Sequence, residues 1–177
     1  QRQAFDNWVA PQTFSCPMSG NLSPSLDETS VKTLDKDMQK VLFVCIHNSA
    51  RSQMAEAFLN ELGTGRFYAE SAGLEPGTLN PVVVEAMPEV GLDISENTCK
   101  AIEGFFPRVE EFAYVVTVCD ETSAERCPIF PSSVKRLHWG FPDPSSLEGS
   151  AEEKLVRTRE IRDLIRARIE QWLSSGV

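Results

Sequence analysis

The sequence predicts an α/β fold: a single domain with a four-stranded parallel sheet flanked by helices, preceded by an N-terminal extension. Short apolar runs rich in Val alternate along the chain with segments of helical periodicity, an order typical of parallel sheets with right-handed crossovers. The chain has 177 residues, which suits one core of ordinary size better than two. We therefore expect a loosely structured extension over residues 1–40 and one domain over residues 41–177.

Four apolar runs are the predicted strands: 41–45, 66–71, 113–118 and 134–138. The first, Val41 to Cys45, is short and continuous, as expected of a strand buried on both faces of a parallel sheet. The third leads directly into Cys119. Because open parallel sheets bind ligands beyond the carboxyl ends of their strands, the thiols of Cys45 and Cys119 should share the functional edge of the sheet.

Three segments have helical patterns. Gln53 to Leu62 follows the first strand, and Ser52 is suited to open that helix. Asn80-Pro81 is a typical helix start, and Gly91 would end that second helix. In the last helix, 152–173, one apolar stripe should face the core: Leu155, Ile161, Ile165, Ile169 and Trp172. The arginines of this helix are expected to form a solvated face: Arg157, Arg159, Arg162, Arg166 and Arg168.

Composition and charge exclude several classes of protein. Apolar residues make up 41% of the chain and charged residues 24%, as in ordinary globular proteins. No apolar run approaches the roughly 20 residues of a membrane span, and a net charge of -9 argues against nucleic acid as a partner. The five cysteines are too few and too unevenly spaced for a secreted disulfide scaffold. We therefore expect a cytoplasmic protein that binds neither nucleic acid nor membranes.

Residues 1–40 differ in composition from the rest of the chain. Prolines interrupt a stretch that contains Ser, Thr and Asn and shows little apolar periodicity. We interpret it as an extension that lays Phe5, Trp8 and Phe14 on the domain surface, with Cys16 as a bystander. A tag or the stub of a fused domain would have the same composition.

A loop from Cys45 to Ser52, with the sequence CIHNSARS, joins the first strand to the first helix. It is short enough for its N–H groups to point inward and cradle a tetrahedral oxyanion, and Arg51 can hold two of the oxygens. The helix N-terminus and Arg51 would favour the thiolate of Cys45, a predicted nucleophile. The spacing makes a structural cysteine with a chance arginine nearby the weaker interpretation. The expected substrate-binding residues are Ile46, His47, Asn48, Ser49, Ala50, Arg51 and Ser52.

Two further cysteines, Cys119 and Cys127, stand eight residues apart across a polar segment. Such a segment can form about two helical turns or an irregular loop, and it can rearrange at modest cost. Spacing alone leaves a buried structural Cys119, a surface Cys127 or half of a metal site open. Zinc is disfavoured because no second closely spaced Cys or His pair accompanies them, so no metal is expected.

The stretch CIHNSARSQMAE, from Cys45 to Glu56, resembles the phosphate-binding loop of the low-molecular-weight protein tyrosine phosphatases and, more closely, that of the arsenate reductases that share their fold. Downstream, Cys119, Cys127-Pro and His138-Trp-Gly-Phe-Pro-Asp143-Pro are similar to signatures of the thioredoxin-coupled arsenate reductases. The resemblance extends over residues 41–173 and does not include the first 40 residues.

The resemblance implies that the chain detoxifies arsenate by reducing it to arsenite. Cys45 would form a covalent adduct with arsenate while Asp143 protonates the leaving oxygen, although Asp143 could instead be a turn former before Pro144. Cys119 would then attack Cys45 and release arsenite, and Cys127 would exchange with Cys119. The resulting disulfide would be reduced by thioredoxin, an external reductant, with no bound cofactor. Phosphate or sulfate would compete with arsenate.

Two other functions stay open. A phosphatase acting on phosphotyrosine or small phosphate esters would use Cys45, Arg51 and Asp143 but would have no use for Cys119 and Cys127. A thiol-based sensor of arsenite or oxidants would use the three cysteines and would need an output surface.

The sequence departs from the resemblance at two positions. Ala50 stands where some loops have a further cysteine. Lys100 stands where some members have an acidic potassium ligand, beside positions that match Asn48, Glu56 and Ser71. Because a lysine ammonium could replace the ion, we expect no cation site.

Overall fold

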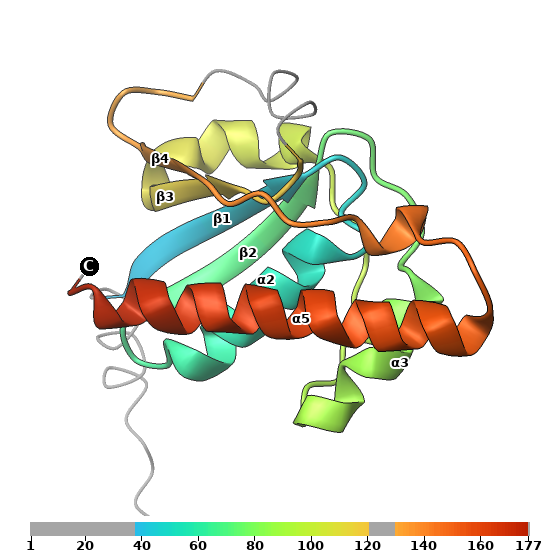
Figure 1. The fold of residues 1–177 in the computed structure, drawn as a ribbon. Coiled ribbons are helices and arrows are strands. Elements are labelled where there is room, and N and C mark those ends of the chain that lie inside the picture. The colour runs from blue at the N-terminus through green and yellow to red at the C-terminus, as the bar shows by residue number, and fades with distance from the viewer. Residues whose placement is uncertain (1–37, 121–129, 177) are drawn as a thin grey trace, which may run out of the picture.

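The computed structural model describes residues 38–120 and 130–176, and it confirms the predicted α/β fold with a four-stranded parallel sheet (Figure 1). The strands are β1 (Gln39–Cys45), β2 (Phe67–Gly73), β3 (Phe112–Thr117) and β4 (Lys135–His138), in the spatial order β2-β1-β3-β4. The helices are α2 (Arg51–Leu62), α3 (Pro81–Ala86) and α5 (Ala151–Ser174), with 3₁₀ helices over Pro88–Val90, Ile102–Glu111 and Pro144–Ser146.

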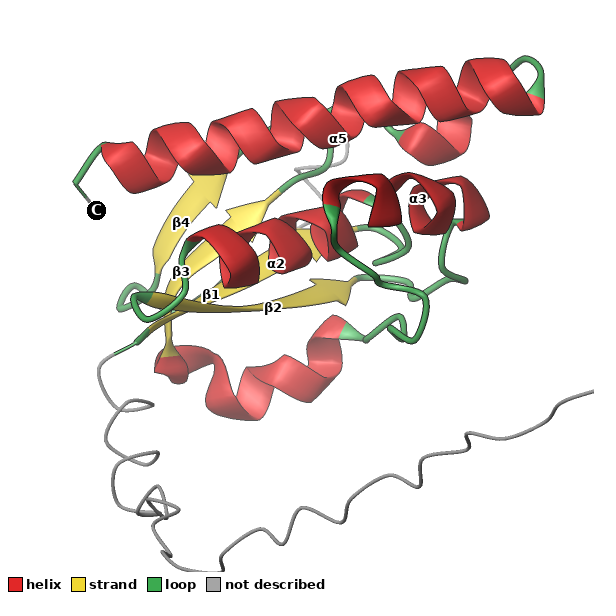
Figure 2. Cartoon of the chain, turned by 90° about the horizontal axis from the view of Figure 1, so that it is seen from below, coloured by secondary structure: helices red, strands yellow, loops and turns green. Residues whose placement is uncertain are grey.

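Helices cover both faces of the sheet, as Figure 2 shows. On one face, Val41 and Phe43 of β1 join the core formed with α2, α3 and α5. On the other face, Leu42 and Val44 pack with Phe105 of the 3₁₀ helix Ile102–Glu111. Successive residues of a strand point to opposite faces, so β1 is buried on both sides and its position is fixed from above and below.

The long helix α5 closes the domain as predicted, with one exception. All five residues of the expected apolar stripe are buried, and Ser150 and Glu153 form a capping box at its start. The expected solvated arginine face is wrong at Arg162, which is buried and donates to Ala86 O at 2.7 Å and to Glu89 at 3.0 Å. It thereby satisfies a carbonyl at the end of α3, and it ties α3 to α5.

Several boundaries differ from the predicted ones. Helix α2 begins at Arg51, two residues before the predicted start, because the loop has already turned into helical geometry there. Asn80 does cap α3, but the helix ends at Ala86, and Pro88 begins a separate 3₁₀ turn since proline lacks the N–H that would continue the helix. The stretch Ile102–Glu111, where no helix was predicted, is a 3₁₀ helix.

Some predicted features lie outside the described residues. Phe5, Trp8, Phe14 and Cys16 of the extension and Cys127 of the second cysteine pair are among them, so their proposed roles stay predictions. Within the described part of the chain, no helix combines the length and the apolar character needed to cross a membrane.

Candidate active site

The loop between β1 and α2 has its carbonyl groups turned outward. A neighbouring segment, residues 74–80, donates N–H groups to four of them: to the carbonyl oxygens of Cys45, Ile46, His47 and Ser49, at 2.8 to 3.1 Å. In a planar trans peptide, the N–H of the following residue points away from such a carbonyl. The N–H groups of Ile46, His47, Asn48 and Ala50 therefore point away from the segment 74–80, which is the orientation an oxyanion cradle requires.

Gly73, the last residue of β2, allows the loop to lie this close to the sheet. A Cβ atom at position 73 would be 2.8 Å from Asn48 N and 2.9 Å from Ile46 O, both backbone atoms. Such a contact is too short for any side chain. The absence of a side chain at Gly73 is thus a condition for the observed loop.

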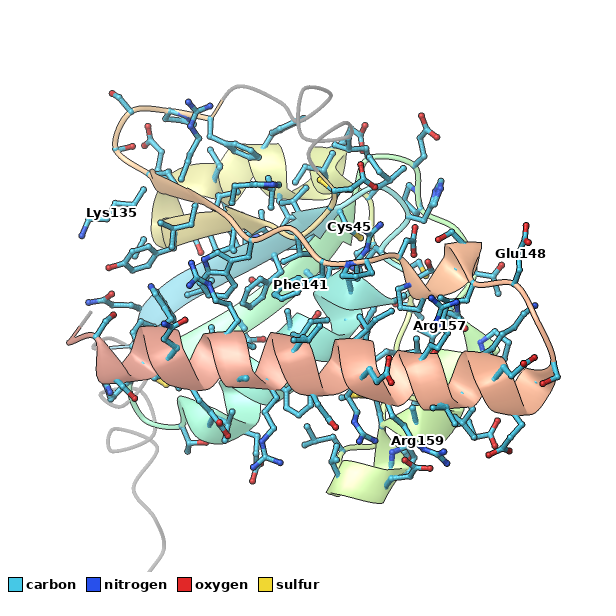
Figure 3. The ribbon with its side chains drawn as sticks, in the orientation of Figure 1. Cys45, Lys135, Phe141, Glu148, Arg157 and Arg159 are labelled. Carbon is cyan, nitrogen blue, oxygen red and sulfur yellow. The ribbon has the colours of Figure 1, made fainter. Side chains whose placement is uncertain are left out.

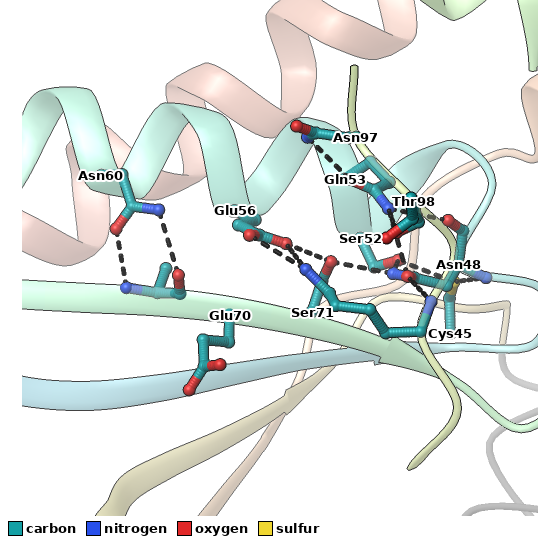
Figure 4. Close-up of polar contacts among 12 residues, drawn as sticks. Cys45, Asn48, Ser52, Gln53, Glu56, Asn60, Glu70, Ser71, Asn97 and Thr98 are labelled. Carbon is teal, nitrogen blue, oxygen red and sulfur yellow. Dashed lines mark hydrogen bonds and ion pairs between the residues drawn. The ribbon is translucent and has the colours of Figure 1, made fainter. Parts of the chain in front are cut away.

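The buried side chain of Asn48 holds the loop from inside (Figure 4). Its amide donates to Ser52 Oγ at 2.9 Å and to Ser71 Oγ at 2.8 Å, and its oxygen accepts from Lys100 N at 2.7 Å. Asn48 has a φ of 50°, in the left-handed region that asparagine tolerates better than most residues. These bonds connect the loop to α2, β2 and the 98–101 segment.

The sulfur of Cys45 receives two hydrogen bonds. Asn48 N donates to Sγ at 3.0 Å, and Ser52 Oγ lies 2.9 Å from it. Because Ser52 Oγ already accepts from the Asn48 amide, its own proton is free to point at the sulfur. Ser52 lies in the first turn of α2, where its hydroxyl group contacts the sulfur of Cys45. The expectation that Ser52 caps the helix is wrong.

Arg51 is held at the other side of the loop by the 139–143 segment. It is buried, and its guanidinium donates to Phe141 O at 3.0 Å and to Asp143 Oδ2 at 2.9 Å. Phe141 lies between the sheet and α5 (Figure 3). Asp143 Oδ1 also accepts from Ser145 N at 3.0 Å, so the same residue forms the turn and reaches the site. Asp143 thus forms a turn before the 3₁₀ helix Pro144–Ser146, and its role as a general acid stays a prediction.

Cys119 lies at the same edge of the sheet as Cys45. It follows β3, the strand next to β1, and Val118 N donates to Val44 O at 2.9 Å. Burial raises the pKa of the Cys119 thiol, and the charge of Arg51 opposes that rise. The structure places Cys45 and Cys119 at the one edge of the sheet where both were expected, and the charge of Arg51 acts on Cys119.

Behind the loop, Lys100 occupies the position where a potassium site was considered. Its Nζ lies 3.1 and 3.0 Å from the two carboxylate oxygens of Glu56, and Glu56 also accepts from Ser71 Oγ. Among the described residues, no group of three or more His, Cys, Asp and Glu could hold a metal ion. The expectation of no cation site stays a prediction, which the Glu56–Lys100 pair supports.

Sequence reasoning missed Gln53 and Asp120. Gln53 is fully buried and donates to Asn48 O at 3.1 Å and to Thr98 O at 3.0 Å, which fastens the loop to the 97–98 segment. The sequence signal for this buried role was the position of Gln53, a polar residue in the first turn of a helix face that is otherwise apolar. Asp120 Oδ2 lies 3.9 Å from the Arg51 guanidinium, and only its position directly after Cys119 pointed to the site.

Comparison with known proteins shows a family and individual relatives to which the chain is similar. The family model described as low molecular weight phosphotyrosine protein phosphatase matches residues 40–175. An arsenate reductase from Shouchella clausii is 42% identical over 136 residues, which cover 77% of this chain and 96% of that protein.

Solved structures of arsenate reductases are also similar to this chain. An arsenate reductase in a phosphate-binding state has a TM-score of 0.61 and 31% identity, covering 78% of this chain and 98% of that one. A thioredoxin-dependent arsenate reductase from Corynebacterium glutamicum has a TM-score of 0.60 and 27% identity, covering 82% of this chain and 65% of that one.

Gly73→Ala should disrupt the anion cradle, because its Cβ would collide with backbone atoms that cannot swing aside. Overpacking of this kind costs about 1–3 kcal/mol or more, so we expect a lower Tm and at least a tenfold weaker affinity for inorganic phosphate, measured by calorimetry. Gly77→Ala is the matched control, since its Cβ would lie 3.5 Å from His47 Cβ, an ordinary contact. Equal phosphate affinity in the two variants would show that the loop does not depend on Gly73.

Proposed function

The chain belongs to the low molecular weight phosphotyrosine protein phosphatase family, and we propose that within it this protein reduces arsenate to arsenite. The observation that carries the proposal is the presence of Cys119 at the same sheet edge as the Cys45–Arg51 loop. A phosphatase needs the loop and an acid only. A second thiol beside the nucleophile is what a reaction that moves two electrons requires.

The first step uses the loop. Inward N–H groups and the fork of Arg51 bind arsenate, and the thiolate of Cys45 attacks arsenic to form a covalent adduct. Asp143 donates a proton to the departing oxygen. Because Arg51 donates to Asp143 at 2.9 Å, arsenate must share or replace this bond, and the exchange frees the carboxyl group at the moment the substrate is held.

The second and third steps use the other cysteines. Cys119 attacks the sulfur of Cys45, arsenic leaves as arsenite, and a Cys45–Cys119 disulfide remains. Cys127 then attacks Cys119, which regenerates Cys45. The Cys119–Cys127 disulfide that results is the one the reductant must reduce.

Thioredoxin is the proposed reductant, and the thioredoxin-dependent relative from Corynebacterium glutamicum supports this choice. We propose that the protein acts in the cytoplasm, where thioredoxin is kept reduced, with no bound cofactor and no nucleic acid or membrane partner. Phosphate and sulfate share the tetrahedral shape of arsenate and should compete for the loop.

Phosphatase activity is the second candidate, favoured by the family to which the chain belongs. Cys45, Arg51 and Asp143 provide a nucleophile, a clamp and an acid for a phosphate ester. A thiol-based sensor is the third candidate, and it would show arsenite-dependent or oxidant-dependent changes without catalytic turnover of arsenate.

Arsenate turnover by the full chain tests the proposal directly. We expect arsenite release to continue with thioredoxin, thioredoxin reductase and NADPH, and to be at least tenfold slower with glutaredoxin and glutathione. Cys45→Ser should abolish both arsenate reduction and hydrolysis of phosphate esters, since a neutral hydroxyl cannot replace the thiolate. Turnover of arsenate by that variant above background would remove Cys45 from the mechanism.

Variants of the second and third cysteines should stop at different points. Cys127→Ser should release one arsenite per chain and leave Cys45 bonded to Cys119, whereas Cys119→Ser should release none. Peptide mapping after one exposure to arsenate measures this difference. A disulfide that involves Cys16 or Cys99 in the Cys127→Ser protein would contradict the order of steps.

The Asp143→Asn variant distinguishes a role of Asp143 as general acid from a role in forming the turn. The single amide oxygen of asparagine can still accept from Ser145 N, so the turn should survive, although its NH2 group cannot accept from Arg51. Adduct formation should slow by about 10²-fold or more. Rapid mixing with arsenate measures the slowing. Oxidation of the Cys119–Cys127 pair by a chemical oxidant should keep its normal rate. Arsenite release that is unchanged in this variant would leave Asp143 as a turn former.

A further inference from the structure

Cys119 needs a proton acceptor before it can attack Cys45. Only the thiolate of Cys119 can attack. Burial raises the pKa of this thiol, so a smaller fraction is deprotonated at neutral pH. Among the charged groups of the site, Arg51 cannot accept a proton, and the carboxylates of Asp143 and Asp120 lie 2.9 and 3.9 Å from that arginine. An imidazole is a stronger base than a carboxylate.

His138, at the end of β4, lies beside the chain segment that leads to Cys119. The register of the sheet pairs Thr117 with His138, and Thr117 Oγ1 lies 2.7 Å from His138 Nδ1. Thr117 Oγ1 also donates to Leu137 O at 3.4 Å, because a carbonyl oxygen can only accept. The hydroxyl oxygen then accepts from Nδ1–H, which leaves the lone pair of a neutral imidazole on Nε2.

Gly140 leaves open the space between this imidazole and Cys119. Two residues beyond the Thr117–His138 pair, the same register brings Gly140 next to Cys119. The position that a Cβ at Gly140 would take lies 3.6 Å from His138 Nε2 and 3.7 Å from Cys119 O. Neighbouring strands lie about 4.8 Å apart, so a histidine ring on one strand can extend toward a residue two positions further along the next. No side chain of residue 140 separates the lone pair of Nε2 from Cys119.

We infer that His138 is the base that deprotonates Cys119 for its attack on Cys45, a role that rests on the proposed arsenate reductase activity. The proton of Cys119 Sγ moves to His138 Nε2, and the sulfur electron pair forms the bond to Cys45 Sγ. The bond from Cys45 Sγ to arsenic breaks, and its electron pair stays on arsenic, which is reduced from As(V) to As(III). The imidazolium then returns its proton to an arsenite oxygen.

Charged groups around Cys119 act on the transfer in both directions. Arg51 favours the thiolate that the transfer creates, whereas Asp120 and Cys45 oppose it. His138 itself is exposed, so it can regain or lose a proton through solvent between turnovers.

The test is a single turnover in the Cys127→Ser chain, in which one Cys45–Cys119 disulfide ends the reaction. His138→Gln keeps a polar side chain beside Thr117 without a titratable nitrogen, and it should slow arsenite release by about 10²-fold at pH 7. The deficit should shrink as the pH rises, because hydroxide can then take the proton. Arg136→Gln, an exposed change on the same strand, is the control and should match the parent.

Two results would overturn the assignment: release in His138→Gln within about twofold of the parent, since general bases contribute far more, or a deficit that does not change with pH. The second would mean that the ring only packs against its neighbours.

A second measurement needs no arsenate. Alkylation of Cys119 by iodoacetamide, followed by peptide mapping, should slow about tenfold or more in His138→Gln, again in line with loss of a base, while Cys99 keeps its rate as an internal reference. Equal alkylation of Cys119 in both proteins would refute the inference. If the parent chain released no arsenite at all, the proposed function would fail, and the alkylation rates would still decide whether His138 acts on Cys119.

Discussion

The site depends on how the peptide groups between β1 and α2 are oriented, with carbonyl groups outward and N–H groups inward. A short loop can keep its N–H groups on one side only if its carbonyl groups are hydrogen-bonded on the other. The segment 74–80 meets that need with backbone hydrogen bonds to four carbonyl groups, those of Cys45, Ile46, His47 and Ser49. Since buried carbonyl groups without partners cost about 1–3 kcal/mol each, the anion cradle is stable only together with the segment behind it.

Side chains then hold the backbone of the loop in this conformation. Asn48 is the centre of a buried network that includes Ser52, Ser71 and Gln53. Each member of the network is satisfied by another, so none of these polar groups destabilises the core, and together they give the loop one conformation. A rigid loop needs no reorganisation when an oxyanion binds, and that is how preorganised donors stabilise developing charge most effectively.

Much of this arrangement follows from local sequence. The run from Val41 to Cys45, the cap at Asn80 and the apolar stripe of α5 have patterns of short range, and these were predicted. The pairing of Arg51 with Asp143 joins residues far apart in the chain, and only the fold brings them together. Gln53 and Arg162 were misjudged for a related reason: polar side chains are normally solvated, and their burial depends on partners supplied by other elements.

The pairing of Arg51 with Asp143 also bears on how an anion reaches the site. The guanidinium that should attract arsenate has its charge balanced by Asp143, with Asp120 nearby, and the chain as a whole has a net charge of -9. Long-range attraction is therefore weak, and the protein surface repels a dianion on approach. Binding of arsenate therefore depends on short-range contacts with the loop N–H groups. Added salt, which weakens long-range repulsion over about 10 Å at 0.1 M, should leave this short-range grip largely intact.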